Sequence, residues 1–313
     1  MEKRQLGRSG LDIAPLVFGG NVFGWTADET RSFELLDRFV DRGFNAIDTA
    51  DVYSSWAPGL SGGESEAVLG KWLARRGKRD DIVLITKVGL WEPRKGLSTA
   101  NIEAAVNDSL RRLGTDYLDV YFAHIDDEDV PLEETLGAFA KLIEAGKVRA
   151  IGASNYGADR LRQALTVARE QGLPRYEVIQ PLYNLYDRAD FETGLADVVE
   201  EHELGVVSFF SLASGFLTGK YKSAEDLQGV ARAAFLEGYF DERGQALLNN
   251  LRQVAEDQSA TPAQVALAWL MGRPGISAPI ASATSLTQLD ELMDAADLSL
   301  SAAAIETLEA PGR

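Results

Sequence analysis

The sequence contains no cysteine and only two histidines, His124 and His202. Disulfides and thiolate catalysis are therefore excluded, and a metal site built from several histidines cannot form, so we expect no metal cofactor. No apolar run approaches the roughly 18 residues that a membrane span needs, and the N-terminus is not followed by the apolar segment of a signal peptide. We expect a soluble cytoplasmic protein that does not associate with membranes.

Basic residues are also scarce: 31 Lys and Arg stand against 48 Asp and Glu, which gives a formal net charge of −17. This balance argues against nucleic acid or an anionic membrane surface as the main partner, although it allows a nucleotide to be bound locally. A small-molecule substrate is the expected partner. The 313 residues contain no linker rich in Pro, Gly or Ser, so we expect one domain over residues 1–313, as a monomer or small homo-oligomer.

Short apolar runs alternate with longer stretches of helical periodicity along the chain. The expected strands cover residues 15–18, 44–47, 82–85, 117–122, 148–151, 177–179, 206–209 and 276–280. The expected helices cover residues 30–41, 65–75, 99–113, 132–144, 159–169, 190–203, 261–271 and 286–295. Thr261 and Pro262 indicate a helix start, and Gly146 indicates a helix end.

Eight such units in about 300 residues are typical of an α/β protein with a closed (β/α)₈ barrel, a TIM barrel, rather than an open sheet. Residues 3–13, with Gly7 and Gly10, are expected to form an N-terminal β-hairpin that could plug the barrel floor. The long irregular stretch 222–242, on the opposite face, is predicted to fold over the site as a lid.

Reactive side chains follow the apolar runs. This places them at the carboxyl ends of the strands, where (β/α)₈ barrels have their active sites. These residues are Asp48, Lys87, His124, Ser154, Asn155 and Gln180. Each alone has an ordinary structural explanation, such as a solvated lysine or a capping aspartate. Their coincidence at several strand ends favours a shared site, whereas His202 is expected on a helix surface.

This set suggests a reaction. An ammonium beside a phenol lowers the pKa of the phenol, so Lys87 could make Tyr53 a competent acid. Asp48 would hold Lys87, and His124 could donate a hydrogen bond to a carbonyl oxygen on which charge develops. Protonation of an alkoxide needs a hydride donor, and Ser154, Asn155 and Gln180 provide partners for a nicotinamide carboxamide.

The chain resembles the aldo-keto reductase family over essentially its whole length. The matching stretches are LGRSGL at 6–11, FGG at 18–20, GFNAIDTADVY at 43–53, GESE at 63–66, ITK at 85–87, GASNY at 152–156 and QPLYN at 180–184. The resemblance implies a barrel that binds NADP(H) or NAD(H) without a Rossmann domain and reversibly reduces aldehydes or ketones. It assigns the catalytic tetrad to Asp48, Tyr53, Lys87 and His124, with Tyr53 as the general acid.

The resemblance also implies a cofactor site that includes Asp48. The other expected contacts are Gly20, Asn21, Ser154, Asn155, Gln180, Phe209, Phe210, Ser211, Leu212, Gly215, Leu217, Lys220, Ser282, Ala283, Thr284, Ser285, Gln288 and Glu291. Phe209 would stack on the nicotinamide in place of the family's tyrosine, and Lys220 would face the pyrophosphate. Phe210 and Ser211 depart from the family's Ser-Pro pattern.

A second departure bears on the choice of cofactor. Relatives that use NADP commonly carry Lys or Arg near the 2′-phosphate, whereas this chain has Gln288 and no cation there. Hydroxyl groups and a helix N-terminus could still bind a phosphate. We therefore expect both cofactors to be used, with NADPH modestly favoured.

The substrate is less defined by the sequence. Trp25, Trp56 and Trp91 follow early strands and could form an aromatic wall beside Tyr53 and His124 for a bulky or apolar carbonyl compound. Two alternatives to a reductase stay open. One is a cofactor-sensing regulatory subunit with slow turnover, and the other is a barrel isomerase or lyase, which would leave Asn155, Gln180 and Phe209 unexplained.

Overall fold

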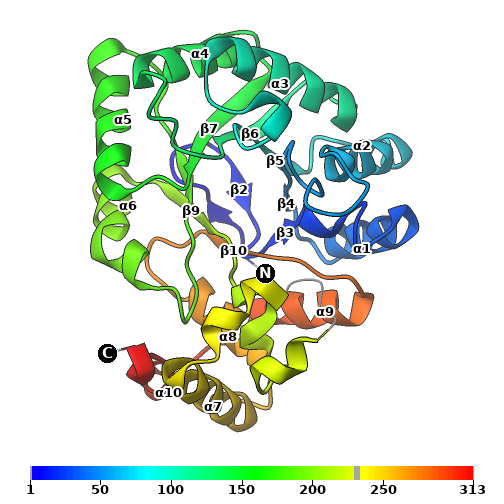
Figure 1. Ribbon diagram of the computed structural model, residues 1–313, viewed down its shortest axis with the longest axis vertical. Coiled ribbons are helices and arrows are strands. Elements are labelled where there is room, and N and C mark those ends of the chain that lie inside the picture. The colour runs from blue at the N-terminus through cyan, green and yellow to red at the C-terminus, as the bar shows by residue number, and fades with distance from the viewer. Residues whose placement is uncertain (1, 229–232, 313) are drawn as a thin grey trace.

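Eight parallel strands form a closed barrel in the computed structural model, which describes residues 2–228 and 233–312. The strand order is β10-β3-β4-β5-β6-β7-β8-β9. The strands are β3 (Val17–Gly19), β4 (Ala46–Asp48), β5 (Val83–Val88), β6 (Leu118–Ala123), β7 (Val148–Ser154), β8 (Val178–Gln180), β9 (Gly205–Ser208) and β10 (Ala278–Ala281). The predicted (β/α)₈ fold is confirmed, and Figure 1 shows the helices arranged around the strands.

Helices follow the strands and cover the barrel. They are α1 (Glu29–Asp41), α2 (Glu64–Arg76), α3 (Thr99–Leu113), α4 (Leu132–Glu144), α5 (Ala158–Gln171), α6 (Ala196–His202), α7 (Glu242–Asp257), α8 (Pro262–Met271), α9 (Leu286–Asp294) and α10 (Ala302–Glu309). Their ends follow local chemistry: Thr261 forms a capping box with Gln264 at the start of α8, and Gly146, at φ +70°, follows the end of α4. None of the helices within the described ranges has the length and apolarity needed to cross a bilayer.

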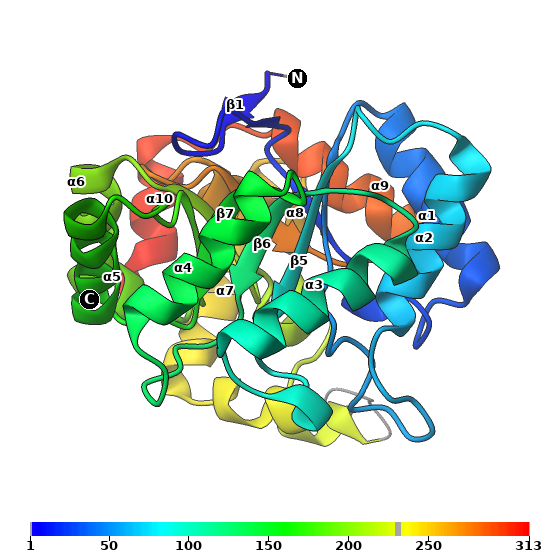
Figure 2. The same cartoon turned by 90° about the horizontal axis from the view of Figure 1, so that it is seen from above.

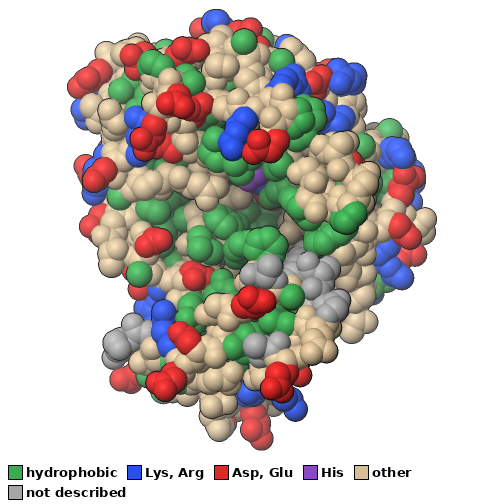
Figure 3. Space-filling model, viewed as in Figure 1, with side chains coloured by type: hydrophobic (Ala, Val, Ile, Leu, Met, Phe, Trp, Pro, Cys, Tyr) green, Lys and Arg blue, Asp and Glu red, His purple; other side chains and the backbone are tan. Residues whose placement is uncertain are grey.

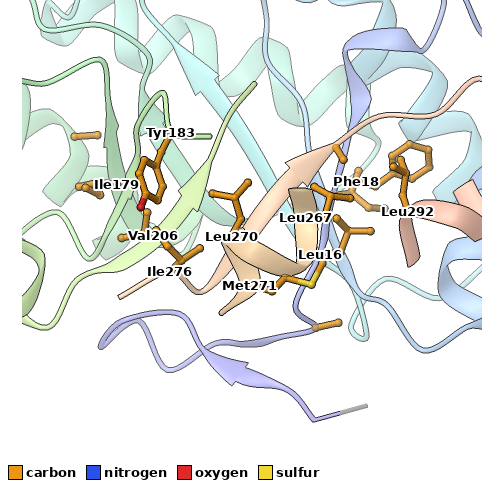
Figure 4. Packing of buried hydrophobic residues seen from close by; sticks show 14 of the residues in the cluster. Leu16, Phe18, Ile179, Tyr183, Val206, Leu267, Leu270, Met271, Ile276 and Leu292 are labelled. Carbon is orange, nitrogen blue, oxygen red and sulfur yellow. The ribbon is translucent and has the colours of Figure 1, made fainter. Parts of the chain in front are cut away.

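The hydrophobic core has two layers because both faces of a parallel barrel strand are buried. Val17, Ile85 and Val120 belong to the cluster inside the barrel. A larger cluster lies between strands and helices, and Figure 4 shows part of it, with Leu270 of α8 beside Val206 and Ile276. The rigid double-layered wall fixes the strand ends that carry the polar residues.

The N-terminal hairpin closes one end of the barrel, as predicted. Strands β1 (Arg4–Gln5) and β2 (Asp12–Ile13) pair in antiparallel register, and the buried side chains of Leu6, Leu11 and Ile13 join the cluster inside the barrel. Figure 2 shows this hairpin on one side of the molecule and the short turns at Ala233–Phe235 and Glu237–Tyr239, in yellow, on the opposite side. Access to the barrel interior is therefore from the carboxyl ends of the strands.

Some element boundaries differ from the sequence expectation. Strand β3 begins at Val17 and not at residue 15, in keeping with the inability of Pro15 to donate a ladder hydrogen bond. The stretch 190–203 opens with a π-helical turn, Phe191–Leu195, before α6. Helices α7 and α10 were not predicted, and the lid segment contains short 3₁₀ turns at Ala224–Leu227, Ala233–Phe235 and Glu237–Tyr239. Residues 229–232 of the predicted lid lie outside the described residues.

Gly7 is required by close backbone contact in the hairpin. It has φ +58°, and a Cβ atom there would lie 2.4 Å from the backbone nitrogen of Gly205 and 2.5 Å from the carbonyl oxygen of Glu177. Gly10 also has a positive φ, +72°, but nothing lies within 4 Å of its Cβ position. A side chain at Gly10 would thus meet backbone strain alone, whereas a side chain at Gly7 would meet both backbone strain and steric overlap.

We predict that Gly7→Ala destabilises the protein clearly more than Gly10→Ala, for which left-handed strain alone should cost about 1–2 kcal/mol. Thermal and urea unfolding of both variants would measure the difference. Equal losses of stability would contradict the inferred contact between the hairpin and the barrel floor.

Candidate active site

Asp48, Tyr53 and Lys87 are joined by hydrogen bonds at the carboxyl ends of β4 and β5. The Lys87 Nζ donates to Asp48 Oδ2 at 2.7 Å, to the Tyr53 hydroxyl at 2.8 Å and to the Thr49 carbonyl at 2.8 Å. The Tyr53 hydroxyl lies 3.0 Å from Asp48 Oδ2, to which it donates. Asp48 is the last residue of β4 and Lys87 lies near the end of β5, so the paired strands bring the two residues together.

The ion pair between Lys87 and Asp48 is buried, with side-chain exposures of 0% and 1%. Burial lowers the pKa of the Lys87 ammonium, while the charge and hydrogen bond of Asp48 oppose that effect. All three donor positions of the ammonium are used by the contacts described above. Lys87 is therefore held against the phenol oxygen. It is not the solvated lysine that is ordinarily found after a strand.

Tyr53 differs from the sequence expectation in its electrostatics. Burial raises the pKa of Tyr53 well above its usual value, and the charge and hydrogen bond of Asp48 raise it further. The expected lowering by Lys87 does not dominate because the hydroxyl is withdrawn from water and donates to a carboxylate. The phenol therefore keeps its proton at neutral pH, and the adjacent ammonium is placed to stabilise the phenolate once that proton has left.

His124 follows β6, and its ring lies 6.2 Å from the Tyr53 ring, measured between centroids. Burial lowers the pKa of His124 well below its usual value, and the positive charge of Lys87 lowers it further. A neutral imidazole has one N–H donor. The Nδ1 atom is buried without a hydrogen-bond partner among the described residues, and the ring lines a cavity.

Gln180 connects the ion pair to a second group of polar side chains. Its Nε2 donates to Asp48 Oδ1 at 2.9 Å, and its backbone carbonyl accepts from Ser154 Oγ at 2.9 Å. Asn155, at φ +59°, donates through Nδ2 to the His124 carbonyl at 2.8 Å. Strands β7 and β8 pair Ser154 with Gln180, which explains why the Ser154 hydroxyl reaches a backbone carbonyl 26 positions away.

Asp48, Tyr53, His124, Ser154, Asn155 and Gln180 line one cavity of about 750 Å³. It extends from Asp48, Tyr53 and His124 past the β9 end to the start of α9, and Figure 3 shows it as a hollow bordered by hydrophobic side chains with a histidine inside. The sequence-predicted residues that line it are Asn21, Trp25, Asp48, Tyr53, Trp56, His124, Ser154, Asn155, Gln180, Phe209, Phe210, Ser211, Leu212, Gly215, Lys220, Ser282, Thr284, Gln288 and Glu291.

Six predicted site residues do not line this cavity. Lys87 lies beneath it, and Leu217 and Ala283 are buried in the core. The other three are engaged elsewhere: the Gly20 carbonyl accepts from Ser65, Ser285 caps α9, and the Trp91 indole donates to the Ser61 carbonyl. Trp25 and Trp56 thus line the cavity, and Trp91 does not.

Several lining residues were not predicted for the site. They are Gly19, Val22, Thr26, Leu90, Ser214, Thr218, Tyr221, Ala263, Ile280, Ala281 and Leu292. Phe235 also lines the cavity, and it belongs to the stretch 222–242 that was predicted as a lid. Leu90 could have been found from its place just after a strand. Ser214 could not, because its place depends on a turn of left-handed residues, at φ +57° for Ser214 and +105° for Gly215.

The far part of the cavity carries groups that could hold a phosphate. The Ser214 Oγ is buried without a partner in the described structure and belongs to a cavity-lining residue, so a phosphate oxygen would satisfy it. Lys220 is the only Lys or Arg among the described lining residues. Phe209 follows β9 and lines the cavity, where an aromatic ring could stack on a flat group.

A second charge cluster lies behind Lys87. Arg112 Nε donates to Glu66 Oε2 at 2.7 Å, and Thr86 Oγ1 donates to Glu66 Oε1 at 2.6 Å. Asp51 is buried nearby with its Oδ1 unpaired among the described residues. Burial raises the pKa of Asp51 to about 7, with a further contribution from Glu66, against the opposing charges of Arg112 and Lys87.

Comparison with known proteins places this geometry in context. The model of the Aldo/keto reductase family matches residues 15–311. "Protein tas" of Escherichia coli K12 is 31% identical across 99% of this chain and 97% of its own length. "Uncharacterized oxidoreductase YrpG" of Bacillus subtilis is 32% identical across 96% and 92%. A "Probable voltage-gated potassium channel subunit beta" of Arabidopsis thaliana is 33% identical across 95% and 92%.

The raised pKa of Asp51 predicts a pH-dependent stability. Its carboxyl has a pKa of about 7 when folded and about 3.9 when unfolded. The folded state therefore binds more protons between these values, and the free energy of unfolding falls as pH rises through that window. Asp51→Asn removes the cost of ionising this buried carboxyl. The melting temperature of the variant should therefore rise relative to that of the wild type as pH is raised from about 5 to about 8.

Thermal melts across this pH range would measure the effect, with the exposed Asp116→Asn as the matched control. A difference between Asp51→Asn and wild type that is independent of pH would contradict the assignment.

Proposed function

This chain belongs to the aldo/keto reductase family, and we propose that it reduces the carbonyl group of an aldehyde or ketone with NAD(P)H, with Tyr53 as the general acid. The reaction is reversible, so alcohol oxidation is the same chemistry in the other direction. The observation that carries the proposal is the contact of the buried Lys87 ammonium with both Asp48 and Tyr53 beside a cavity of about 750 Å³.

The protein's own residues supply the proton that the carbonyl oxygen takes up and stabilise the charges that result. When bound, the nicotinamide supplies the hydride that reduces the carbonyl carbon. Tyr53 gives its proton to the carbonyl oxygen, and the Lys87 ammonium stabilises the phenolate that remains. His124 donates a hydrogen bond to the same oxygen as negative charge develops there. Asp48 keeps Lys87 charged and in place.

Gln180, Ser154 and Asn155 are proposed to hold the carboxamide of the cofactor, and Phe209 to stack on its ring. Ser214 and Lys220 are proposed to face the pyrophosphate. Binding would require the amide of Gln180 to share or exchange its contact with Asp48. These contacts are common to both nicotinamide cofactors.

We propose that both NADPH and NADH are used, with NADPH modestly favoured. At the far end of the cavity the Gln288 Oε1 accepts from the backbone and hydroxyl of Thr284, at 3.0 and 3.1 Å. Glu291 also lines this end. A 2′-phosphate would find hydroxyls there but no described guanidinium, which supports weak discrimination between the two cofactors.

A second candidate is a regulatory subunit that senses its cofactor and turns over slowly. It is favoured by the names of the plant relatives, which are described as potassium channel beta subunits. Both candidates use the same dinucleotide site. They differ in turnover, since a reductase should consume NADPH steadily with an activated aldehyde such as 4-nitrobenzaldehyde.

We predict that Tyr53→Phe lowers kcat by at least about a hundredfold, the usual contribution of a positioned acid, while the Kd for NADPH stays near the wild-type value. Steady-state NADPH oxidation and fluorescence titration of the cofactor would measure the two effects. Tyr156→Phe is the matched control, because its hydroxyl contacts only Tyr176, away from the cavity, in the described hydrogen bonds. Unchanged turnover in Tyr53→Phe would defeat the acid assignment.

A further inference from the structure

Large exposed apolar side chains are concentrated at one place. Among the described residues they are Trp56, Phe210 and Phe235, with exposures of 48%, 39% and 60%. All three line the same cavity as Tyr53 and His124. Exposed apolar surface gathered at one concave site, rather than scattered, indicates a surface that an apolar partner covers.

The three rings belong to two separate groups of ring contacts. Trp56 contacts Tyr53 and Trp25 edge to face, at centroid distances of 5.8 and 5.7 Å. Phe210 contacts Phe235 at 6.1 Å and comes from the segment after β9. The first group therefore extends directly from the proposed acid, and the second group comes from a distant part of the chain.

Phe210 is held in place by its backbone. It has φ +51°, a left-handed conformation that an aromatic residue rarely adopts. Its carbonyl accepts from the Ala213 N–H at 2.7 Å and from the Nδ2 of Asn184 at 3.0 Å, and Asn184 is fully buried. Such strain persists where surrounding contacts enforce it, and it is concentrated at functional sites. Here it directs a ring into the cavity where the family pattern has a serine.

We propose that Trp56, Phe210 and Phe235 form an aromatic entrance that selects carbonyl compounds whose non-reacting part is a flat, apolar ring system. Phe210 is then the main specificity-determining residue, in place of the cofactor contact that the family resemblance implies for it. The inference rests on the proposed function and names its substrate class. Rings of the substrate would lie against the edges and faces of these side chains. The carbonyl group would point inward to Tyr53 and His124.

The same surface disfavours polar substrates. A sugar would place its hydroxyl groups against rings that cannot accept or donate ordinary hydrogen bonds, and each unpaired hydroxyl would reduce binding. A small aliphatic aldehyde could react, but it would not reach both groups of rings. The expected order of kcat/KM is therefore 2-naphthaldehyde above butanal, and butanal above glyceraldehyde.

The test compares three variants, Trp56→Ala, Phe210→Gly and Phe235→Ala, with NADPH as the cofactor. Phe210→Gly removes the ring and relieves the left-handed strain, so loss of folding is not expected. Phe33→Ala is the matched control, because Phe33 is a half-buried ring that contacts Arg75 on the outer helices. Each variant should lower kcat/KM for 2-naphthaldehyde by about tenfold, the scale of one lost aromatic contact.

For butanal the rate should stay close to wild type, and so should the Kd for NADPH. An equal loss with both aldehydes would overturn the proposal. The proposal would also be overturned if the variants bound NADPH more weakly but kept the wild-type ratio of kcat/KM between the two aldehydes. The rings would then cover the dinucleotide and not the substrate.

Failure of the proposed function is distinguishable from failure of this inference. If the wild type oxidises NADPH with none of the aldehydes, the proposed function fails. Binding of 2-naphthaldehyde to the complex with NADP⁺ can then be followed by ligand-observed NMR. Binding that is lost in Phe210→Gly and kept in Phe33→Ala supports the aromatic entrance, and binding that is equal in both variants overturns it.

Discussion

The contact between Lys87 and Asp48 is the interaction on which the site depends. Both side chains are buried, so neither charge is tolerable without the other. Their contact fixes an ammonium 2.8 Å from the Tyr53 oxygen and ties Gln180 to the same carboxylate. One buried pair thus sets the position of the proposed acid and of the amide proposed to hold the cofactor.

The barrel makes this ion pair possible because packing on the inner and outer faces of the strands fixes the strand register. Leu6 and Ile13 of the hairpin fill one end of the barrel, and the helices cover its outer face. At the open end, the residues after each strand differ in role. Asp48 and Lys87, at the ends of β4 and β5, form the buried ion pair, while Phe210, after β9, places an apolar ring in the cavity lining.

Much of this could be predicted from the sequence, because strand period and strand-end position are local properties. Asp48, His124 and Gln180 follow apolar runs, and parallel pairing brings such ends together. Long-range packing could not be predicted. The sequence does not show that Trp91 is bound to the Ser61 carbonyl, nor that Phe210 adopts a left-handed conformation. The direction of the Tyr53 pKa shift was predicted wrongly because the burial of the phenol depends on the whole fold.

The most direct test of the central claim is the single-turnover rate of aldehyde reduction by Lys87→Met with NADPH prebound. We expect a rate at least about a hundredfold below that of the wild type, with NADPH still bound at near wild-type affinity, because Lys87→Met removes the ammonium beside the phenol and leaves in place the side chains proposed to hold the cofactor. A folded variant that reduces the aldehyde at close to the wild-type rate would contradict the account.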